Sequence, residues 1–351
     1  IEEDAAGTIT LTATLSLIAD EAVTVSFSTS GAAVAGTDYA SLSSITIAAG
    51  SATGTTSFTP TNDAIYEADE VATVAVSSVS GANATENGSQ SVNITISEDE
   101  SAPTVSLASS SASIAENSGS NITLTATLSQ IADEAVTVSF STSGVAVAGT
   151  DYASLSSITI AAGSATGTTS FTPTNDAIYE ADEVATVAVS SVSGANATEN
   201  GSQSVNITIS EDESAPTVSL ASSSASIAEN SGSNITLTAT LSQIADEAVT
   251  VSFSTSGVAV AGTDYASLSS ITIAAGSATG TTSFTPTNDA IYEGDEVATV
   301  AVSSVSGADA TESGSQSVSI TVSEDESAPT VSLASSSSSI AENSGSNITL
   351  T

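Results

Sequence analysis

The chain of 351 residues contains no Lys, Arg, His, Cys, Met or Trp, whereas it carries 40 Asp and Glu side chains. Without cationic side chains it cannot neutralise phosphates, which excludes nucleic-acid binding, and an anionic membrane surface would repel it. Without His, Cys or Lys it offers no zinc, haem or iron–sulfur site, no P-loop and no His- or Lys-activated nucleophile. The remaining ligand atoms are carboxylate, hydroxyl and carbonyl oxygens, which bind hard cations.

Long apolar runs are also absent, and none approaches the ~20 residues of a membrane span. The chain is nevertheless 40% hydrophobic and only 11% charged, which distinguishes it from a disordered polyanion. Folded domains are therefore expected, with no membrane insertion in this segment. Ile1 falls within an expected strand of the repeat, so we expect that Ile1 and Thr351 are not natural termini.

Internal repetition determines the domain organisation. Pro103, Pro216 and Pro329 recur at a spacing of 113 residues, which is the length of a domain and not of a solenoid turn. Two complete repeats cover 101–213 and 214–326, preceded by 1–100, which lacks the first strand, and followed by 327–351, the start of a further repeat. The complete repeats differ at five positions, namely Ala181/Gly294, Asn196/Asp309, Asn200/Ser313, Asn206/Ser319 and Ile209/Val322.

Each repeat is expected to be all-β. Segments that alternate apolar and polar residues, many of them β-branched, are separated by Gly, Ser, Asn and Pro. In the second repeat these segments are 104–109, 121–128, 135–142, 156–161, 166–172, 184–191 and 202–210. Seven short strands in one such repeat predict a Greek-key β-sandwich. Phe140 and Phe171 lie in alternating strands and are expected in the core, whereas Tyr152 and Tyr179 are expected to pack beneath the acidic loops.

Strand parity predicts that acidic loops meet at one pole. Because successive strands run up and down, the loops after 104–109, 135–142 and 166–172 share one end with the segment after 202–210. That end, the acidic pole, receives nine of the twelve acids of the second repeat: Glu116, Asp151, Asp176, Glu180, Asp182, Glu183, Glu211, Asp212 and Glu213. The opposite pole receives Asp133, Glu134 and Glu199.

So many carboxylates repel one another strongly. Two unit charges ~4 Å apart repel by roughly 4 kcal/mol at an effective dielectric constant near 20. Either the side chains spread into water, their pKa values rise, or a multivalent cation lies among them. Ca²⁺ accepts six to eight oxygens in flexible geometry, whereas Mg²⁺ demands a tight octahedron, so the sequence favours Ca²⁺.

Four motifs of the repeat resemble the Calx-beta domain family, which occurs in sodium–calcium exchangers and in large bacterial surface proteins. AENSG precedes the second strand, AGTDY lies at 148–152, NDAIYEADE at 175–183 and SEDE at 210–213. The resemblance covers the whole repeat and implies tandem seven-stranded immunoglobulin-like sandwiches of Calx-beta type, with Ca²⁺ as the cofactor. Asn175 departs from the family's usual acid, and Glu211 and Glu213 stand where Asp is usual.

The resemblance also implies the ligands. In the second repeat they are Glu116, Asp151, Asp176, the carbonyl of Ile178, Glu180, Glu183, Glu211, Asp212 and Glu213. In the first repeat they are Glu3, Asp38, Asp63, Ile65, Glu67, Glu70, Glu98, Asp99 and Glu100. In the third repeat they are Glu229, Asp264, Asp289, Ile291, Glu293, Glu296, Glu324, Asp325 and Glu326.

We expect Ca²⁺ at the acidic poles to stiffen the repeats into an elongated rod, the shaft of an extracellular adhesin or surface filament, and the resemblance implies a bacterial protein. Its partners are then calcium ions, neighbouring repeats and other copies in a filament. SEDESAP also resembles a cadherin linker, so a cadherin-like adhesion repeat remains an alternative. Thr-rich strands leave a carbohydrate- or ice-binding module open, and a calcium sensor is a third option. Catalysis is not expected, because carboxylate chemistry such as glycoside hydrolysis needs a cleft that nothing in the sequence indicates.

Overall fold

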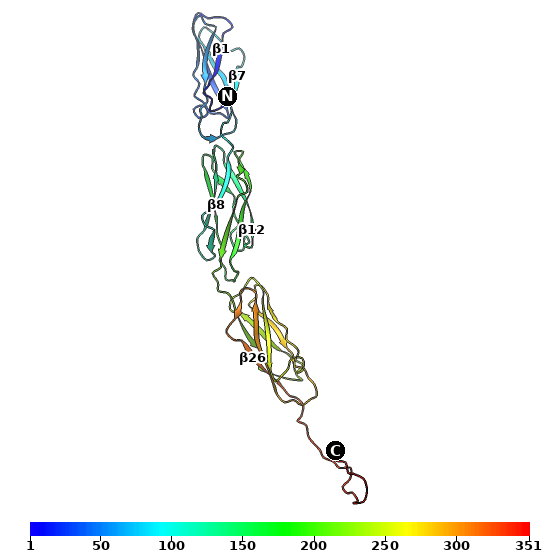
Figure 1. Ribbon diagram of the computed structural model, residues 1–351. Coiled ribbons are helices and arrows are strands. Elements are labelled where there is room, and N and C mark those ends of the chain that lie inside the picture. The colour runs from blue at the N-terminus through cyan, green and yellow to red at the C-terminus, as the bar shows by residue number, and fades with distance from the viewer. The chain divides into compact units, whose positions relative to one another are not determined.

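The computed structural model describes residues 1–351 and is built of strands, turns and loops without a helix. It divides into two compact units, one of residues 1–175 and 182–210, the other of residues 176–181 and 211–351. The first unit holds most of the first two repeats and the second unit holds the third (Figure 1). No element is a helix of the length and apolarity that crossing a membrane requires.

The second repeat is a β-sandwich. One sheet has the strand order β14-β10-β8-β16 and the other has the order β13-β12-β15-β17-β9. Neighbours in each sheet are often distant in sequence, as Greek-key connections require. The strands are β8 (Thr104–Ser109), β9 (Ser113–Ala115), β10 (Ile122–Leu128), β11 (Ile131–Ala132), β12 (Val136–Gly144), β13 (Ile158–Ile160), β14 (Thr166–Phe171), β15 (Glu183–Ser193), β16 (Thr198–Glu199) and β17 (Ser204–Ser210).

The first repeat keeps the larger sheet, in the order β3-β2-β6-β7, and pairs β1 with β4 in a sheet of two strands. It has no strand equivalent to β8. Its short β5 pairs in parallel with β11 of the second repeat. The strands are β1 (Ile9–Thr14), β2 (Val23–Gly31), β3 (Ile45–Ile47), β4 (Thr53–Phe58), β5 (Ile65–Tyr66), β6 (Glu70–Ser80) and β7 (Ser91–Ile96).

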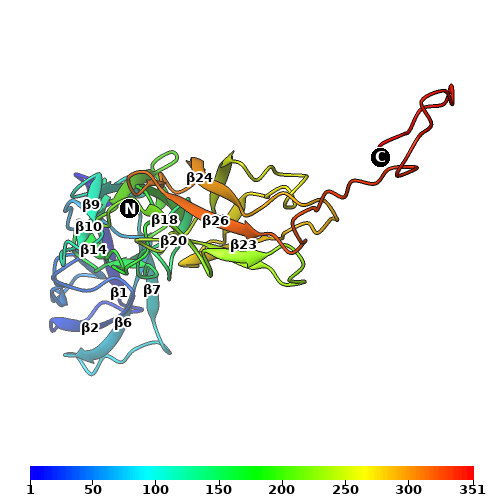
Figure 2. The ribbon, with the colours of Figure 1, turned by 90° about the horizontal axis from the view of Figure 1, so that it is seen from below.

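The third repeat has the sheet orders β23-β20-β18-β25 and β19-β26-β24-β21-β22. Strands β24 and β26 lie side by side as an antiparallel pair (Figure 2). Residues 327–351 contain no further strand, and an isolated bridge joins Ser335 to Leu350. The strands are β18 (Thr217–Ser222), β19 (Ser226–Ala228), β20 (Ile235–Leu241), β21 (Val249–Gly257), β22 (Ile271–Ile273), β23 (Thr279–Phe284), β24 (Glu296–Ser306), β25 (Thr311–Glu312) and β26 (Ser317–Ser323).

All seven strands predicted for the second repeat are present, with ends that differ by at most three residues. The alternation has the expected effect, because β10 buries Ile122, Leu124, Ala126 and Leu128 while the residues between them remain more exposed. The sequence did not predict the short strands β9, β11 and β16. Each has two or three residues, too few for a periodic pattern.

Aromatic pairs lie at the centre of each sandwich. Tyr152 and Phe171 are both fully buried, with ring centroids 4.5 Å apart. Phe140, which was also expected in the core, is only half-buried and packs against the buried cluster. A β-bulge shifts the register of β12 and β15 between Ser139 and Phe140, which breaks the alternation at that residue.

Two glycines in each repeat are required by a close approach of two backbones, and in the second repeat these are Gly144 and Gly194. Gly144 ends β12 with φ of 120°, and a Cβ there would lie 2.0 Å from the carbonyl oxygen of Val184. A side chain is therefore excluded both by the backbone conformation and by contact with β15. Gly31 and Gly257 have the same environment in the other repeats.

Candidate metal centre

Backbone hydrogen bonds bring separate acidic segments together at one pole of the first repeat. The amide of Glu3 donates to the carbonyl of Ser97 at 3.0 Å, which places Glu3 beside the acids that follow β7. The amide of Asp63, in the loop between β4 and β6, donates to Glu3 Oε1 at 2.9 Å. The third repeat has the same arrangement, with the amide of Asp289 2.8 Å from Glu229 Oε1. The convergence expected from strand parity is therefore present.

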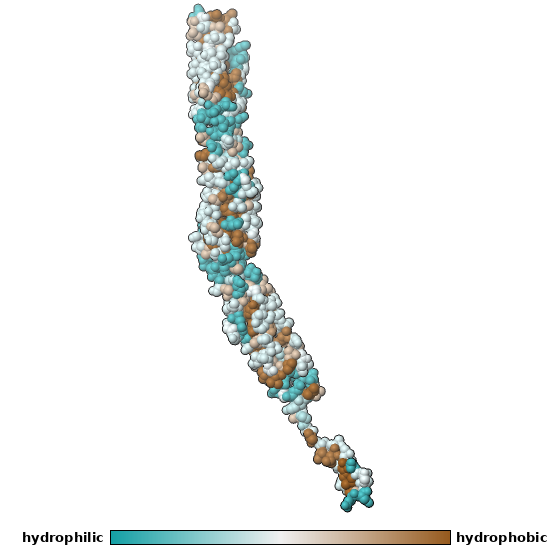
Figure 3. Space-filling model, viewed as in Figure 1, coloured by the Kyte–Doolittle hydropathy of each residue, from teal (hydrophilic) through white to brown (hydrophobic).

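The first carboxylate group at this pole combines one buried Glu with the acidic triplet. Each member offers an oxygen that lies within 4.8 Å of those of the others. In the first repeat the group is Glu3, Glu98, Asp99 and Glu100, and in the third it is Glu229, Glu324, Asp325 and Glu326. Hydrophilic patches mark these ends of the two repeats in Figure 3. Four carboxylates at this spacing provide several of the oxygens that one Ca²⁺ requires.

A second group in the first repeat consists of Asp38, Glu67 and Glu70, whose oxygens also lie within 4.8 Å of one another. Asp38 is held in place because its Oδ2 accepts a hydrogen bond from the amide of Val34 at 2.5 Å. The amide of Glu67 donates to Glu98, which connects this group to the first. In the third repeat Asp264 has the same contact, with the amide of Val260 2.5 Å from its Oδ2.

Asp63 and Ile65 have a different local role from the carboxylates around them. Asp63 Oδ1 accepts a hydrogen bond from the amide of Ile65 at 2.7 Å, which closes a tight turn at the start of β5. The same bond, also 2.7 Å long, joins Asp176 to Ile178 and Asp289 to Ile291. The ligand roles that the family resemblance implies for these residues remain predictions.

The predicted ligands of the second repeat are divided between the two units. Glu116, Asp151 and Glu183 belong to the first unit, and the remaining ligands, Asp176, Ile178, Glu180, Glu211, Asp212 and Glu213, belong to the second. Within the first unit, the amide of Val147 donates to Asp151 Oδ2 at 2.5 Å. Within the second, the amide of Glu180 donates to Glu211 Oε2 at 2.5 Å. Both contacts repeat those of the first repeat.

Burial singles out the same residues. The buried polar or charged side chains of the whole chain are five acids, each at an acidic pole, namely Glu3, Asp38, Glu116, Asp151 and Glu229. Carboxylates are buried only when hydrogen bonds or opposite charges compensate them. The chain has no Lys, Arg or His to compensate them.

Crowding raises the pKa of several of these acids. Burial, followed by the charges of Asp38 and Glu70, raises the pKa of Glu67 to about 7. Burial and the adjacent carboxylate of Asp38 raise the pKa of Glu70 to about 7. Burial and the adjacent carboxylate of Glu98 raise the pKa of Glu100 to about 7 as well. Near neutral pH these three carboxyl groups are therefore partly protonated.

Unpartnered oxygens provide a test of whether a cation fits. Glu70 Oε2, Glu100 Oε2 and Glu326 Oε2 are inaccessible to solvent and have no hydrogen-bond partner. A buried carboxylate oxygen without a donor is costly. Because these three glutamates belong to the clusters of acidic residues described above, a divalent cation bound there would supply the missing interaction. The donor set is entirely oxygen and therefore fits Ca²⁺.

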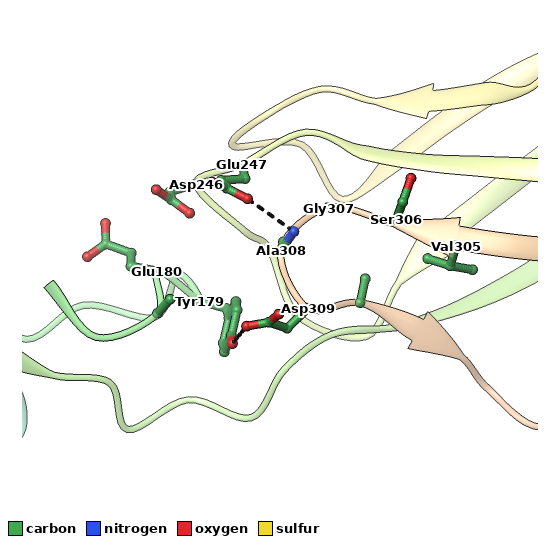
Figure 4. A pocket seen from close by; sticks show the side chains of 11 residues that line it. Tyr179, Glu180, Asp246, Glu247, Val305, Ser306, Gly307, Ala308 and Asp309 are labelled. Atoms are coloured by element: carbon green, nitrogen blue, oxygen red, sulfur yellow. Dashed lines mark hydrogen bonds between the residues drawn. The ribbon is translucent and has the colours of Figure 1, made fainter. Parts of the chain in front are cut away.

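Tyr179, in the acidic loop that carries Asp176 and Glu180, does not lie where the sequence predicted. Instead of packing beneath the carboxylates, Tyr179 enters the core of the third repeat, and its hydroxyl donates to Asp309 Oδ2 at 2.8 Å (Figure 4). A cavity of about 550 Å³ adjoins it, lined by Glu180, Asp246, Glu247 and Ala308 among others. Tyr66 likewise joins the core of the second repeat, and Asn196 Nδ2 donates to its hydroxyl at 2.8 Å. Tyr152 was also expected beneath the acidic loops. It follows Asp151 in the chain, and its side chain is buried in the core of its own repeat.

The sequence therefore defines a class of protein, a tandem array of immunoglobulin-like sandwiches with an acidic pole on each. The Calx-beta domain model matches residues 1–100, 98–213 and 211–326. The chain belongs to the Calx-beta family.

Solved structures with similar folds have low sequence identity to the chain. A crystal structure of CBD12 from CALX1.2 is 13% identical, with 62% of this chain and 100% of that chain covered and a TM-score of 0.29. The calcium-binding domain CBD12 of CALX1.1 is 14% identical, with coverages of 55% and 77% and a TM-score of 0.25. Invasin, a bacterial integrin-binding protein, is 15% identical, with coverages of 92% and 57% and a TM-score of 0.30. No curated protein matches the chain.

Proposed function

We propose that this chain is a structural segment of an extracellular or cell-surface protein whose repeats bind Ca²⁺ at their acidic poles. The observation that carries the proposal is the pair of carboxylate groups in the first repeat, Glu3 with Glu98–Glu100 and Asp38 with Glu67 and Glu70. They occur in a chain without a single cationic side chain. Membership of the Calx-beta family supports Ca²⁺ as the ion.

The proposed consequence of ion binding is mechanical. A cation at this pole would hold four separate segments together, including the loop between β4 and β6 that carries Tyr66 into the second repeat. Binding would thereby restrict the movement of one repeat against the next. A stiffened array of this kind would serve as the rod-like shaft of a bacterial adhesin or surface filament. We assign the acids to ion binding rather than to catalysis, because equivalent groups recur in successive repeats.

Straightness is the property to measure. Single chains imaged by rotary-shadowed electron microscopy, or examined by small-angle scattering, are expected to be extended and uniform in calcium. In chelator they are expected to bend more, and Mg²⁺ should not substitute because it dehydrates reluctantly and demands an octahedral site. Equal straightness in calcium and in chelator would contradict the stiffening role.

A further inference from the structure

A turn just before the last strand of each repeat contains a sequence that can modify itself. In the second repeat this turn covers residues 199–203, before β17, and includes Asn200 followed by Gly201. The first repeat has Asn87 followed by Gly88 at the equivalent position. The third repeat has Ser313 in place of the asparagine. We call the first two segments the Asn-Gly turns, and they hold the two Asn-Gly sequences of the chain.

An asparagine that precedes glycine can lose its side-chain amide without a catalyst. The main-chain nitrogen of the glycine attacks Cγ of the asparagine, the Cγ–Nδ2 bond breaks, and Nδ2 leaves as ammonia with the proton of the attacking amide. Water then opens the succinimide ring that has formed. Opening at Cγ gives aspartate, and opening at the main-chain carbonyl carbon gives isoaspartate. Glycine favours the attack because it has no Cβ to obstruct the approach, and asparagine is accordingly a thermolabile residue.

The Asn-Gly turns leave both reacting groups free. Asn200 and Gly201 are exposed, and neither the side chain of Asn200 nor the amide of Gly201 makes a hydrogen bond. The equivalent residues of the first repeat, Asn87 and Gly88, are exposed and free in the same way. Both glycines have a positive φ, 68° at Gly201 and 73° at Gly88, which a residue with a side chain rarely adopts. A freely accessible nucleophile therefore lies next to a freely accessible amide.

Other asparagines of the chain are protected by the same criterion. The amide of Ser118, which follows Asn117, donates to the carbonyl of Ala115 at 3.1 Å. The amide of Ala197, which follows Asn196, donates to a carbonyl of its own turn at 2.9 Å. Attack by either amide would first require that this hydrogen bond break. The asparagines that precede isoleucine are obstructed by its branched side chain.

We propose that Asn87 and Asn200 are sites of spontaneous deamidation in the folded protein. Each becomes a mixture of aspartate and isoaspartate, whereas the third repeat, with Ser313, is not modified at this turn. Each conversion adds one carboxylate to a chain that already carries 40 Asp and Glu and no cationic side chain. The proposal goes beyond the proposed calcium sites and does not rest on them, because no cation takes part in the reaction.

Isoaspartate should open the turn that fastens the first strand of the second repeat. Gln203 Nε2 donates to the carbonyl of Asn200 at 2.5 Å, and Gln203 Oε1 accepts a hydrogen bond from the amide of Leu107 in β8 at 3.2 Å. In isoaspartate this carbonyl becomes a free carboxylate and the peptide link moves to Cγ, which lengthens the main chain of the turn by one atom. Gln203 then loses the geometry that joins the turn to β8, and the modified repeat should unfold at a lower temperature.

The third repeat shows which substitution the turn accepts. The amide of Ser313 donates to the carbonyl of Val218 at 2.9 Å, as the amide of Asn200 does to Val105. Gln316 Nε2 donates to the carbonyl of Ser313 at 2.5 Å, which is the distance found for Gln203. Serine therefore keeps the contacts of the turn and removes only the reactive amide.

The test uses the full chain and the variants Asn87→Ser, Asn200→Ser and the double variant. Each is kept folded in calcium at mildly alkaline pH and physiological temperature, and its intact mass is followed with time. Two amide-to-acid conversions are expected in the unsubstituted chain, one in each single variant and none in the double variant over the same period. Isoaspartate is measured by enzymatic methylation with an isoaspartyl methyltransferase. In urea the protected asparagines, such as Asn117, should also react, because unfolding releases the amides that follow them.

Two outcomes would overturn the proposal. One is a folded chain that keeps its mass, and the other is a double variant that gains mass as fast as the unsubstituted chain instead of at least several-fold more slowly. Thermal unfolding tests the consequence for the turn. The aged unsubstituted chain should unfold at a lower temperature than the fresh chain, whereas the aged double variant should not change. Equal midpoints for the aged and fresh unsubstituted chain, with isoaspartate present, would contradict the opening of the turn.

Discussion

Tyr66 and Tyr292 form a matched pair for measuring what the packing of this tyrosine against a neighbouring repeat contributes to stability. Both lie in the sequence Asn-Asp-Ala-Ile-Tyr-Glu, but Tyr66 is 8% exposed and Tyr292 is 47% exposed. The difference is 39 percentage points of a side chain that exposes about 200 Å², or about 80 Å². At about 25 cal/mol per Å² this is about 2 kcal/mol. The hydrogen bond from Asn196 adds about 1 kcal/mol.

We therefore expect Tyr66→Ala to lower the free energy of unfolding of the second repeat by about 2–3 kcal/mol. Tyr292→Ala should lower that of the third repeat by less than about 0.5 kcal/mol, as for an exposed surface position. Urea unfolding followed by circular dichroism measures both changes. Hydrogen exchange at the amide of Asp133, which donates to Tyr66, provides a local readout. Equal effects of the two substitutions would refute the argument that Tyr66 stabilises the second repeat by packing into its core.

The acidic pole and the glycine contact lead to four further predictions. Because the pKa values of Glu67, Glu70 and Glu100 are raised to about 7, the folded state binds more protons than the unfolded state. Thermal melts in chelator should therefore show a free energy of unfolding that is highest near about pH 5 and decreases as the pH rises through about 7. Calcium binding should weaken over the same range as the pH falls, because the ligands must be deprotonated, and calorimetry at several pH values measures this. Glu3→Gln should weaken calcium binding at the first repeat about 10–100-fold by calorimetry and leave the other repeats unchanged, whereas Glu21→Gln at the opposite pole should have no effect. Gly144→Ala should destabilise the second repeat by more than about 2 kcal/mol, because a Cβ there would lie 2.0 Å from a carbonyl oxygen. Gly149 has a φ of 92° and no neighbour within 4 Å of an added Cβ, so Gly149→Ala is the control for backbone strain alone in the same melts.

Most of the fold was predictable because its signals are local. The alternation in β8, β10 and β14 is a property of six or seven consecutive residues, and the structure places these strands within a few residues of the prediction. The position of the acids followed from strand parity alone, so Glu3 and Glu98 could be brought to one pole without any knowledge of pairing.

The packing of Tyr66 into the core of the second repeat was not predictable, because its contacts are distant in sequence. Tyr66 contacts Asn196, 130 residues away, through a turn whose only local signature is a Gly-Ala-Asn sequence. The acids Asp63 and Glu67 lie on either side of this tyrosine, and they favoured the prediction that it packs beneath the cation site. A tyrosine conserved in spacing across three copies, inside an otherwise charged loop, was the available signal. The core position predicted for Phe140 failed for a related reason, because a bulge in the neighbouring strand β15 cannot be recognised from the sequence of β12.

The central claim is that the acidic poles bind Ca²⁺ and that binding stabilises the folded repeats. Thermal unfolding of the chain in millimolar Ca²⁺, in chelator and in Mg²⁺ tests it most directly. A ligand that binds only the folded state at 100 times its Kd adds about 2.7 kcal/mol, so a rise of several degrees specific to Ca²⁺ is predicted. An unchanged midpoint, or an equal rise with Mg²⁺ or with monovalent salt, would contradict the account and leave the carboxylates as a polyanionic surface.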